Sequence, residues 1–131
     1  MDAFSNSGRP VGFVYTRDRE RSLAFYQGVL GLALHSSDAF GDFIALEGAL
    51  LRLTVIADHT PSPHPVLGWE VADIAGKARA LLERGVPLTR FPGMEHDDLG
   101  VWTSPDGRSK VGFFSDPDGN VLMLSLIHIS E

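Results

Sequence analysis

The feature that most constrains the fold is an internal repeat. Asp18 precedes the segment RERSLAFYQGVLG, and Asp73 precedes IAGKARALLERG. Each aspartate suits a helix N-cap, and Gly31 and Gly85 suit the stop at the end of each helix. The two aspartates lie 55 residues apart and the two glycines 54. A unit of this length cannot bury the face of its own sheet, so we expect the two copies to share one core.

Apolar runs with strand character flank each predicted helix. PVGFVYT precedes the first helix, and LALHSS, DFIALEG and ALLRLTVIA follow it. HPVLGWEV precedes the second helix, and PLTRF, LGVWT, KVGFF and NVLMLSL follow it. The chain is therefore predicted to be an α+β protein built from two βαβββ modules.

The proline-rich segment DHTPSPHP is typical of a linker. It places module one at about 10–57, the linker at about 58–65 and module two at about 66–126. Residues 1–9 are polar and are predicted to form a flexible N-terminus. Residues 127–131 lie beyond the expected end of the last strand, so we treat them as a tail without a functional role.

The segment FFSDPDGNVLMLS sets two acidic residues and a glycine between two apolar runs. A calcium loop of the EF-hand type needs glycine at position 6 and glutamate at position 12, and counting from Asp116 places Val121 and Ile127 there. Proline, aspartate and glycine in this order favour a tight turn. Pro105-Asp106-Gly107 repeats the signal upstream. Both segments are therefore interpreted as turns between antiparallel strands, not as cation sites.

Composition excludes several classes of function. The 11 basic residues are scattered and outnumbered by 17 acidic ones, giving a net charge of −6, which argues against nucleic-acid binding. No apolar run approaches the roughly 18 residues of a membrane span. The absence of cysteine excludes disulfides, thiolate zinc sites and cysteine nucleophiles. A cytoplasmic location is the default expectation for such a chain.

The duplicated βαβββ pattern, the segment RSLAFYQGVLGL and the ending FFSDPDGNVLML together resemble the vicinal oxygen chelate superfamily. That group includes glyoxalase I, bleomycin-resistance proteins and extradiol dioxygenases. The resemblance covers about residues 10–126. It implies that each module curls half of an incomplete barrel around a cavity, with the helices outside. It also implies that modules pair within one chain or across a homodimer.

The resemblance supplies a test for a metal site. Family enzymes hold a divalent metal with His, Glu or Gln side chains from four strands. Matching by position puts Val11, Arg52, Val66 and Met123 at those places. Valine and methionine lack the oxygen and nitrogen ligands that such metals prefer, and the positive charge of a guanidinium repels a cation. We therefore expect neither a family-type metal site nor another cofactor.

Strand alternation predicts which side chains face the cavity, if the matched metal positions face it. On this basis the ligand-contacting side chains from the strands are predicted to be those of Phe13, Tyr15, Arg52, Glu70 and Met123. Three further aromatic residues are interpreted as flat apolar walls, with ordinary core packing as the alternative. They are Phe91, Trp102 and Phe113.

Arg52 is the most informative of these residues, because an unpaired buried guanidinium is too costly. It is expected to form a salt bridge with Glu47 or Glu70, to lie exposed on an unclosed sheet, or to anchor a carboxylate or phosphate of a ligand. For catalysis, only Glu70, Tyr15 and His96 offer an acid or base, and their spacing forms no triad.

These observations predict a protein that binds a small, partly apolar organic molecule in a metal-free cavity. Sequestration or resistance is the closest family role. The alternative is a lyase, isomerase or dioxygenase-type enzyme of the same superfamily. A third interpretation is a module that modulates another protein and exposes an apolar patch for it.

Overall fold

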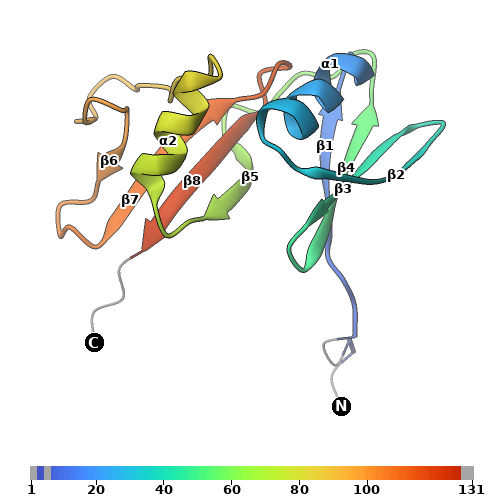
Figure 1. The fold of residues 1–131 in the computed structure, drawn as a ribbon, viewed down its shortest axis with the longest axis horizontal. Coiled ribbons are helices and arrows are strands. Elements are labelled where there is room, and N and C mark those ends of the chain that lie inside the picture. The colour runs from blue at the N-terminus through green and yellow to red at the C-terminus, as the bar shows by residue number, and fades with distance from the viewer. Residues whose placement is uncertain (1–2, 5–6, 128–131) are drawn as a thin grey trace. The chain divides into compact units, whose positions relative to one another are not determined.

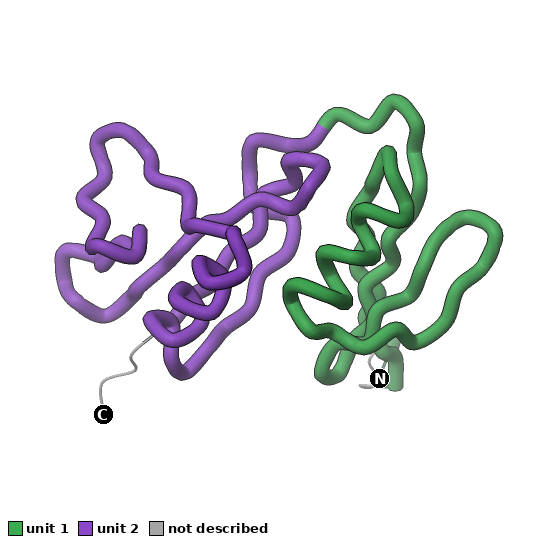
Figure 2. The backbone as a smooth tube through the Cα atoms, turned by 45° about the horizontal axis from the view of Figure 1, so that its top comes forward, with its two compact units in different colours: residues 1–60 green, residues 61–131 purple. Residues whose placement is uncertain are grey.

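The computed structural model describes residues 3–4 and 7–127. The chain divides into two compact units, Met1–Thr60 and Pro61–Glu131 (Figure 2). Each unit contains one βαβββ module, so the predicted α+β class and duplication are confirmed. Residues 128–131 of the predicted tail lie outside the described residues.

The first unit is built as follows: β1 (Val11–Thr16), α1 (Arg19–Leu23) continuing into the π-helix η1 (Ala24–Val29), β2 (Ala33–Asp38), β3 (Gly41–Leu46) and β4 (Ala49–Val55). The second unit is built as follows: β5 (Pro65–Glu70), α2 (Ile74–Glu83), β6 (Trp102–Thr103), β7 (Ser109–Ser115) and β8 (Val121–Ile127).

Both modules have the same sheet topology. The strand orders are β1-β4-β3-β2 and β5-β8-β7-β6. The first strand of each module pairs in parallel with the last, and the other pairs are antiparallel. Neither four-stranded sheet closes on itself, and Figure 1 shows α2 lying across β7 and β8. Each sheet therefore has one face covered by its helix and one open face.

The helix ends behave as the repeat predicts. The carboxylate of Asp18 accepts a hydrogen bond from the Arg21 N–H at 3.1 Å, and that of Asp73 accepts one from the Gly76 N–H at 3.0 Å. Gly31 and Gly85 adopt φ values of 76° and 82°, which other residues rarely tolerate. The caps and stops are confirmed.

Two local predictions are wrong. PLTRF forms no strand and contributes only an isolated bridge from Thr89 to Phe113. Prolines at 87 and 92 leave little continuous backbone that can donate to a ladder. Helical spacing after Asp73 predicts that Leu82 points inward together with Ile74, Ala78 and Leu81. Leu82 is instead 50% exposed, because the buried stripe of α2 contains only the other three residues.

The covered faces hold the apolar core. In the first unit Tyr26, Ile44 and Leu51 are fully buried. In the second unit Leu122 and Phe114 are buried, and the Phe114 ring stacks on Trp69 at 6.3 Å.

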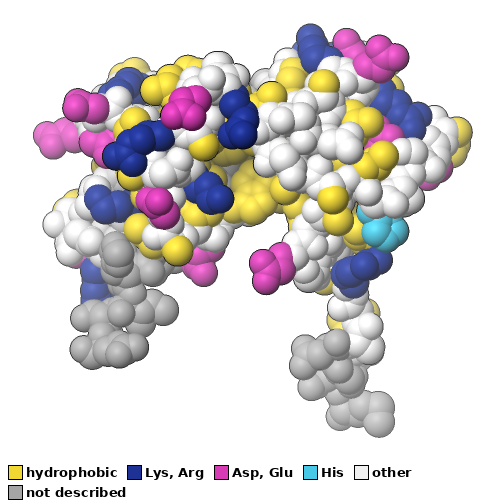
Figure 3. All heavy atoms as spheres, in the orientation of Figure 1, with side chains coloured by type: hydrophobic (Ala, Val, Ile, Leu, Met, Phe, Trp, Pro, Cys, Tyr) yellow, Lys and Arg dark blue, Asp and Glu magenta, His cyan; other side chains and the backbone are white. Residues whose placement is uncertain are grey.

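On the surface drawn in Figure 3, basic side chains are interspersed with acidic ones in each unit. Among the described residues, no helix is long and apolar enough to cross a bilayer.

Candidate functional site

The open face of the second sheet carries half of the predicted ligand-contacting residues. Gly68, Met123 and Phe113 lie side by side across β5, β8 and β7. The next row contains Glu70, Ser125, Val111 and Trp102. We call these seven residues the second-unit open face.

Alternation explains why these side chains share a face. The residues next to them in sequence, among them Trp69, Leu122, Leu124 and Phe114, point to the other side. Leu122, Leu124 and Phe114 are buried there. The side chains of Val111, Phe113 and Met123 are only half-buried, so a flat apolar surface is accessible.

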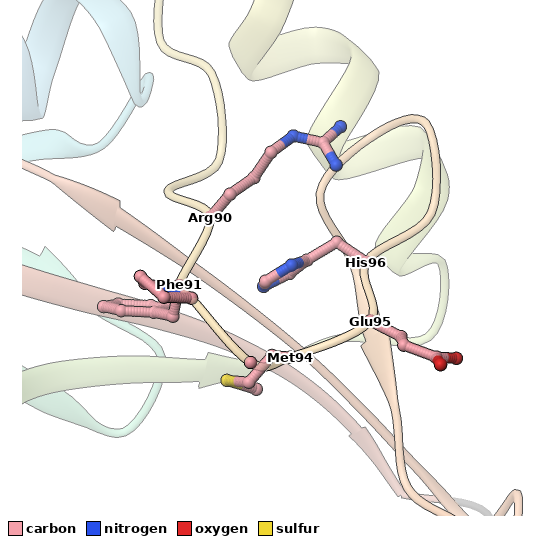
Figure 4. A pocket seen from close by; sticks show the side chains of 7 residues that line it. Arg90, Phe91, Met94, Glu95 and His96 are labelled. Carbon is pink, nitrogen blue, oxygen red and sulfur yellow. The ribbon is translucent and has the colours of Figure 1, made fainter.

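A pocket of about 700 Å³ adjoins this face, and the segment 90–96 lines it (Figure 4). Phe91 links the pocket to the sheet, because its ring meets the Phe113 ring edge-on at 5.3 Å and 88°. In Figure 4 the His96 ring turns into the space between Arg90 and Met94, whereas the Glu95 carboxylate points away. The structure thus brings an aromatic ring, a thioether and an imidazole together in one loop.

Two polar groups of this loop have different environments. Arg90 Nη2 donates to the backbone oxygen of Asp98 at 2.9 Å, which holds its guanidinium away from Phe91 and Met94. Within the described part of the chain, the buried His96 Nε2 has no hydrogen-bond partner. A buried polar atom of this kind costs about 1–3 kcal/mol unless water or another group satisfies it.

Sequence reasoning missed most of this loop. Besides Phe91 and His96, the sequence singles out only Met94 among the lining residues, either as an adaptable side chain of a pocket or as a gap filler. The interpretation of PLTRF as a strand overlooks the loop that forms here. The Pro92-Gly93 pair is typical of such a loop, and Gly93 adopts φ 83° in it.

The open face of the first sheet carries Phe13, Tyr15 and Arg52. Phe13, Arg52 and Phe43 lie in one row across β1, β4 and β3. Phe13 is 55% exposed and Tyr15 39% exposed, and the Tyr15 ring lies 5.6 Å from the His59 ring. The predicted ligand-contacting residues therefore form two groups, one in each unit.

Arg52 is paired, but with neither expected partner. Its Nη1 and Nη2 donate to the two carboxylate oxygens of Asp38, each at 2.9 Å. The guanidinium reaches β2 by lying over the Phe43 ring, 4.5 Å from its centroid. Glu47 lies beyond the far end of β3 in the turn to β4, away from this row. The salt-bridge interpretation holds, and the identity of the partner is corrected to Asp38.

The ion pair affects the titration of Asp38. The hydrogen bonds from Arg52, followed by that from the Phe40 N–H, lower the pKa of Asp38 from 3.8 to about 2. The charged carboxylate therefore favours the folded state above pH 4, and this contribution is lost as the pH falls from about 4 to about 2.

Asp38→Asn is expected to lower stability at pH 7 and to have a much smaller effect near pH 2, the pKa of Asp38 in the folded protein, where much of the wild-type carboxylate is protonated. Asparagine keeps an oxygen that can accept hydrogen bonds from the N–H groups of the turn. The difference in stability between the wild type and the variant therefore reports the contribution of the ion pair. Urea unfolding at pH 7, 3 and 2 measures it. Glu47→Gln removes a charge outside the pair and is the control; a D38N effect independent of pH would contradict the assignment.

The catalytic candidates are divided between the two units. Tyr15 belongs to the first unit, and Glu70 and His96 belong to the second. In the part of the chain that the structure describes, no hydrogen bond joins Glu70 to His96. Among the described residues of the second unit, Glu70 and His96 therefore form no hydrogen-bonded acid–base pair.

The donor set at the family's metal positions does not fit a divalent ion. Val11, Arg52, Val66 and Met123 offer no carboxylate or imidazole, and the guanidinium of Arg52 is cationic. A register shift between Pro65 and Leu67 disturbs the strand at Val66. Elsewhere in the described ranges, no three His, Asp or Glu side chains gather closely enough to hold a metal.

Comparison with known proteins agrees with this architecture. The family model described as the Glyoxalase/Bleomycin resistance protein/Dioxygenase superfamily matches residues 10–124. The chain belongs to this superfamily, as the resemblance indicated. No curated protein matches the chain.

Solved structures share the fold at low sequence identity. A glyoxalase family protein from Bacillus anthracis has a TM-score of 0.72 at 17% identity, covering 92% of this chain and 94% of its own. A lactoylglutathione lyase from Agrobacterium tumefaciens has a TM-score of 0.67 at 20% identity, covering 92% and 93%. A fosfomycin resistance protein from Listeria monocytogenes has a TM-score of 0.70 at 12% identity, covering 91% and 92%. At these identities the likeness concerns the fold alone.

Proposed function

We propose that the protein binds a small, partly apolar organic molecule on the second-unit open face and the adjoining pocket, without a metal ion. The observation that carries the proposal is the contact of Phe91 with Phe113, which joins the pocket to the centre of the open face. Apolar walls with a few polar groups are the usual composition of a ligand site.

The lining favours a ligand with a flat ring. Phe113 and Phe91 present an edge-on aromatic pair, against which a third ring can pack at similar spacing. Met123 lies beside Phe113, and Met94 lines the pocket, so flexible thioethers adapt the surface to the shape of the ligand. Sequestration of such a compound is the role we infer. The fosfomycin resistance protein among the structural relatives supports that inference.

Pairing with a second copy is part of the proposal. β1 is an edge strand and carries two exposed apolar side chains, Val11 at 41% and Phe13 at 55%. Exposed apolar side chains along a strand edge favour association.

Phe113→Ala is expected to weaken binding of a neutral aromatic probe, 4-phenylbutanol, about tenfold, because one wall of the site is removed. Chemical-shift titration of the metal-free protein gives the dissociation constant and locates the probe. The matched control is Phe40→Ala, since Phe40 is 70% exposed at the β2–β3 turn of the other unit.

Two results would overturn the proposal. One is equal loss of probe affinity in the two phenylalanine variants, which would place binding elsewhere. The other is stoichiometric Ni, Zn, Fe or Mn in protein purified without added metal, together with turnover that depends on it. That second result would favour the lyase, isomerase or dioxygenase alternative.

A further inference from the structure

His96 carries a polar atom that packing against aromatic rings leaves unused. Among the described residues its Nε2 is buried and has no hydrogen-bond partner, although the side chain as a whole is only half-buried. The ring turns into the space between Arg90 and Met94 (Figure 4). A buried polar atom without a partner costs free energy, and a ligand group that bonds to it removes that cost.

Resting on the proposed function, we propose that His96 determines which polar group the ligand carries. The ligand is an aromatic compound with an uncharged hydroxyl or carboxamide group on a short chain. Its ring packs against Phe91 and Phe113, and its polar group bonds to His96 Nε2. Hydroxyl and carboxamide groups both donate and accept hydrogen bonds, so either tautomer of the imidazole is satisfied.

The backbone that carries the imidazole is held in place. His96 forms an isolated antiparallel bridge with Trp102. The Asp97 N–H donates to the Val101 oxygen at 2.9 Å. The Asp97 carboxylate accepts from the N–H groups of Leu99 and Val101, each at 2.9 Å. The loop is thus tied to the start of β6 before a ligand arrives, which lowers the entropic cost of binding.

Access to Nε2 depends on Met94. Because the atom is out of contact with solvent, a ligand reaches it only when a neighbouring side chain moves aside. The Met94 thioether lines the same pocket, and its three rotatable bonds allow it to move at small cost. After moving, it can pack against the chain that joins the ring of the ligand to its polar group.

The charges around the pocket favour an uncharged polar group. Arg90 flanks the imidazole, so a second cation there is repelled. Glu95 in the same loop, Glu70 on the adjoining open face and the net charge of −6 oppose an anion. A hydroxyl or a carboxamide meets neither repulsion and also loses less hydration than a charged group.

Two probes that differ by one oxygen atom test the inference: 4-phenylbutanol and butylbenzene. His96→Leu and His96→Phe each remove the polar atom and keep an apolar side chain. We expect both variants to weaken binding of the alcohol about tenfold and to leave that of the hydrocarbon within about twofold. His96→Gln offers an amide at a similar reach and is expected to recover most of the lost affinity.

His64→Leu is the matched control, because His64 is an exposed histidine in the segment before β5. It is expected to change the affinity for neither probe. Chemical-shift titration of the intact chain gives the dissociation constants and shows whether the pocket resonances move.

The outcomes separate this inference from the proposed function. Equal losses of affinity for the two probes in the His96 variants would overturn the role of His96. A preference for the anionic 4-phenylbutyrate over the alcohol that depends on His96 would overturn the uncharged ligand class. In either case weaker binding by F113A would still support the open-face site. Failure of every probe to shift open-face or pocket resonances would count against both proposals.

Discussion

Asp116→Ala is expected to lower the free energy of unfolding by about 3 kcal/mol, because three buried donors lose their acceptor. The carboxylate of Asp116 accepts from the backbone N–H groups of Asp118 and Asn120, each at 2.9 Å, and from Asn120 Nδ2 at 2.8 Å. All three residues are buried, at 5% exposure or less. Water cannot readily replace the lost oxygen atoms, so the cost of desolvation remains.

The second proline–aspartate–glycine turn provides the control. Asp106 accepts from Ser104 Oγ at 2.6 Å and from the Arg108 N–H at 3.0 Å, but it is exposed. Asp106→Ala is expected to cost no more than about 1 kcal/mol, since water satisfies the freed donors. Urea unfolding of both variants at pH 7 compares them. Similar losses of unfolding free energy in the two variants would show that the burial of Asp116 does not account for its contribution to stability.

Gly41→Ala is expected to destabilise the first unit by about 3 kcal/mol or more. An added Cβ would overlap the carbonyl oxygen of Leu53 and lie 2.9 Å from its carbonyl carbon. These are backbone atoms, so no side-chain rotation relieves the clash, and β3 must move away from β4. The movement would also disturb Arg19, which donates to the Gly41 oxygen at 3.0 Å and to the buried Asp42.

The matched control for this prediction is Gly12→Ala, in β1. An added Cβ at Gly12 meets nothing within 4 Å, and its φ is not positive. Its effect is expected to stay within about 0.5 kcal/mol. Thermal or urea unfolding measures both variants, and a tolerated G41A would mean that β3 and β4 have more freedom than their close approach indicates.

The local features of the fold were predictable because they depend on neighbouring residues. The N-caps Asp18 and Asp73 and the stops Gly31 and Gly85 follow from residue type and spacing. The first helix is less regular than the α-helix expected between this cap and this stop. Its second half is a π-helix in which the Leu30 N–H bonds to the Phe25 oxygen, and Ser22 and Phe25 are buried alongside Tyr26.

The candidate site was only partly predictable. Alternation placed Glu70 and Met123 on a common face, and pairing with β7 adds Phe113. The arrangement of Phe91 against Phe113 could not be predicted, because it depends on how a non-repetitive loop returns to the sheet.

The sequence by itself determined the duplication, the α+β class and the covered and open faces of the strands. Each of these depends on residue type and on spacing along the chain. Only the tertiary structure decided that Arg52 pairs with Asp38 and that the segment 90–96 forms a pocket beside Phe113. Such contacts depend on strand register and loop path, which bring together residues that are distant in sequence.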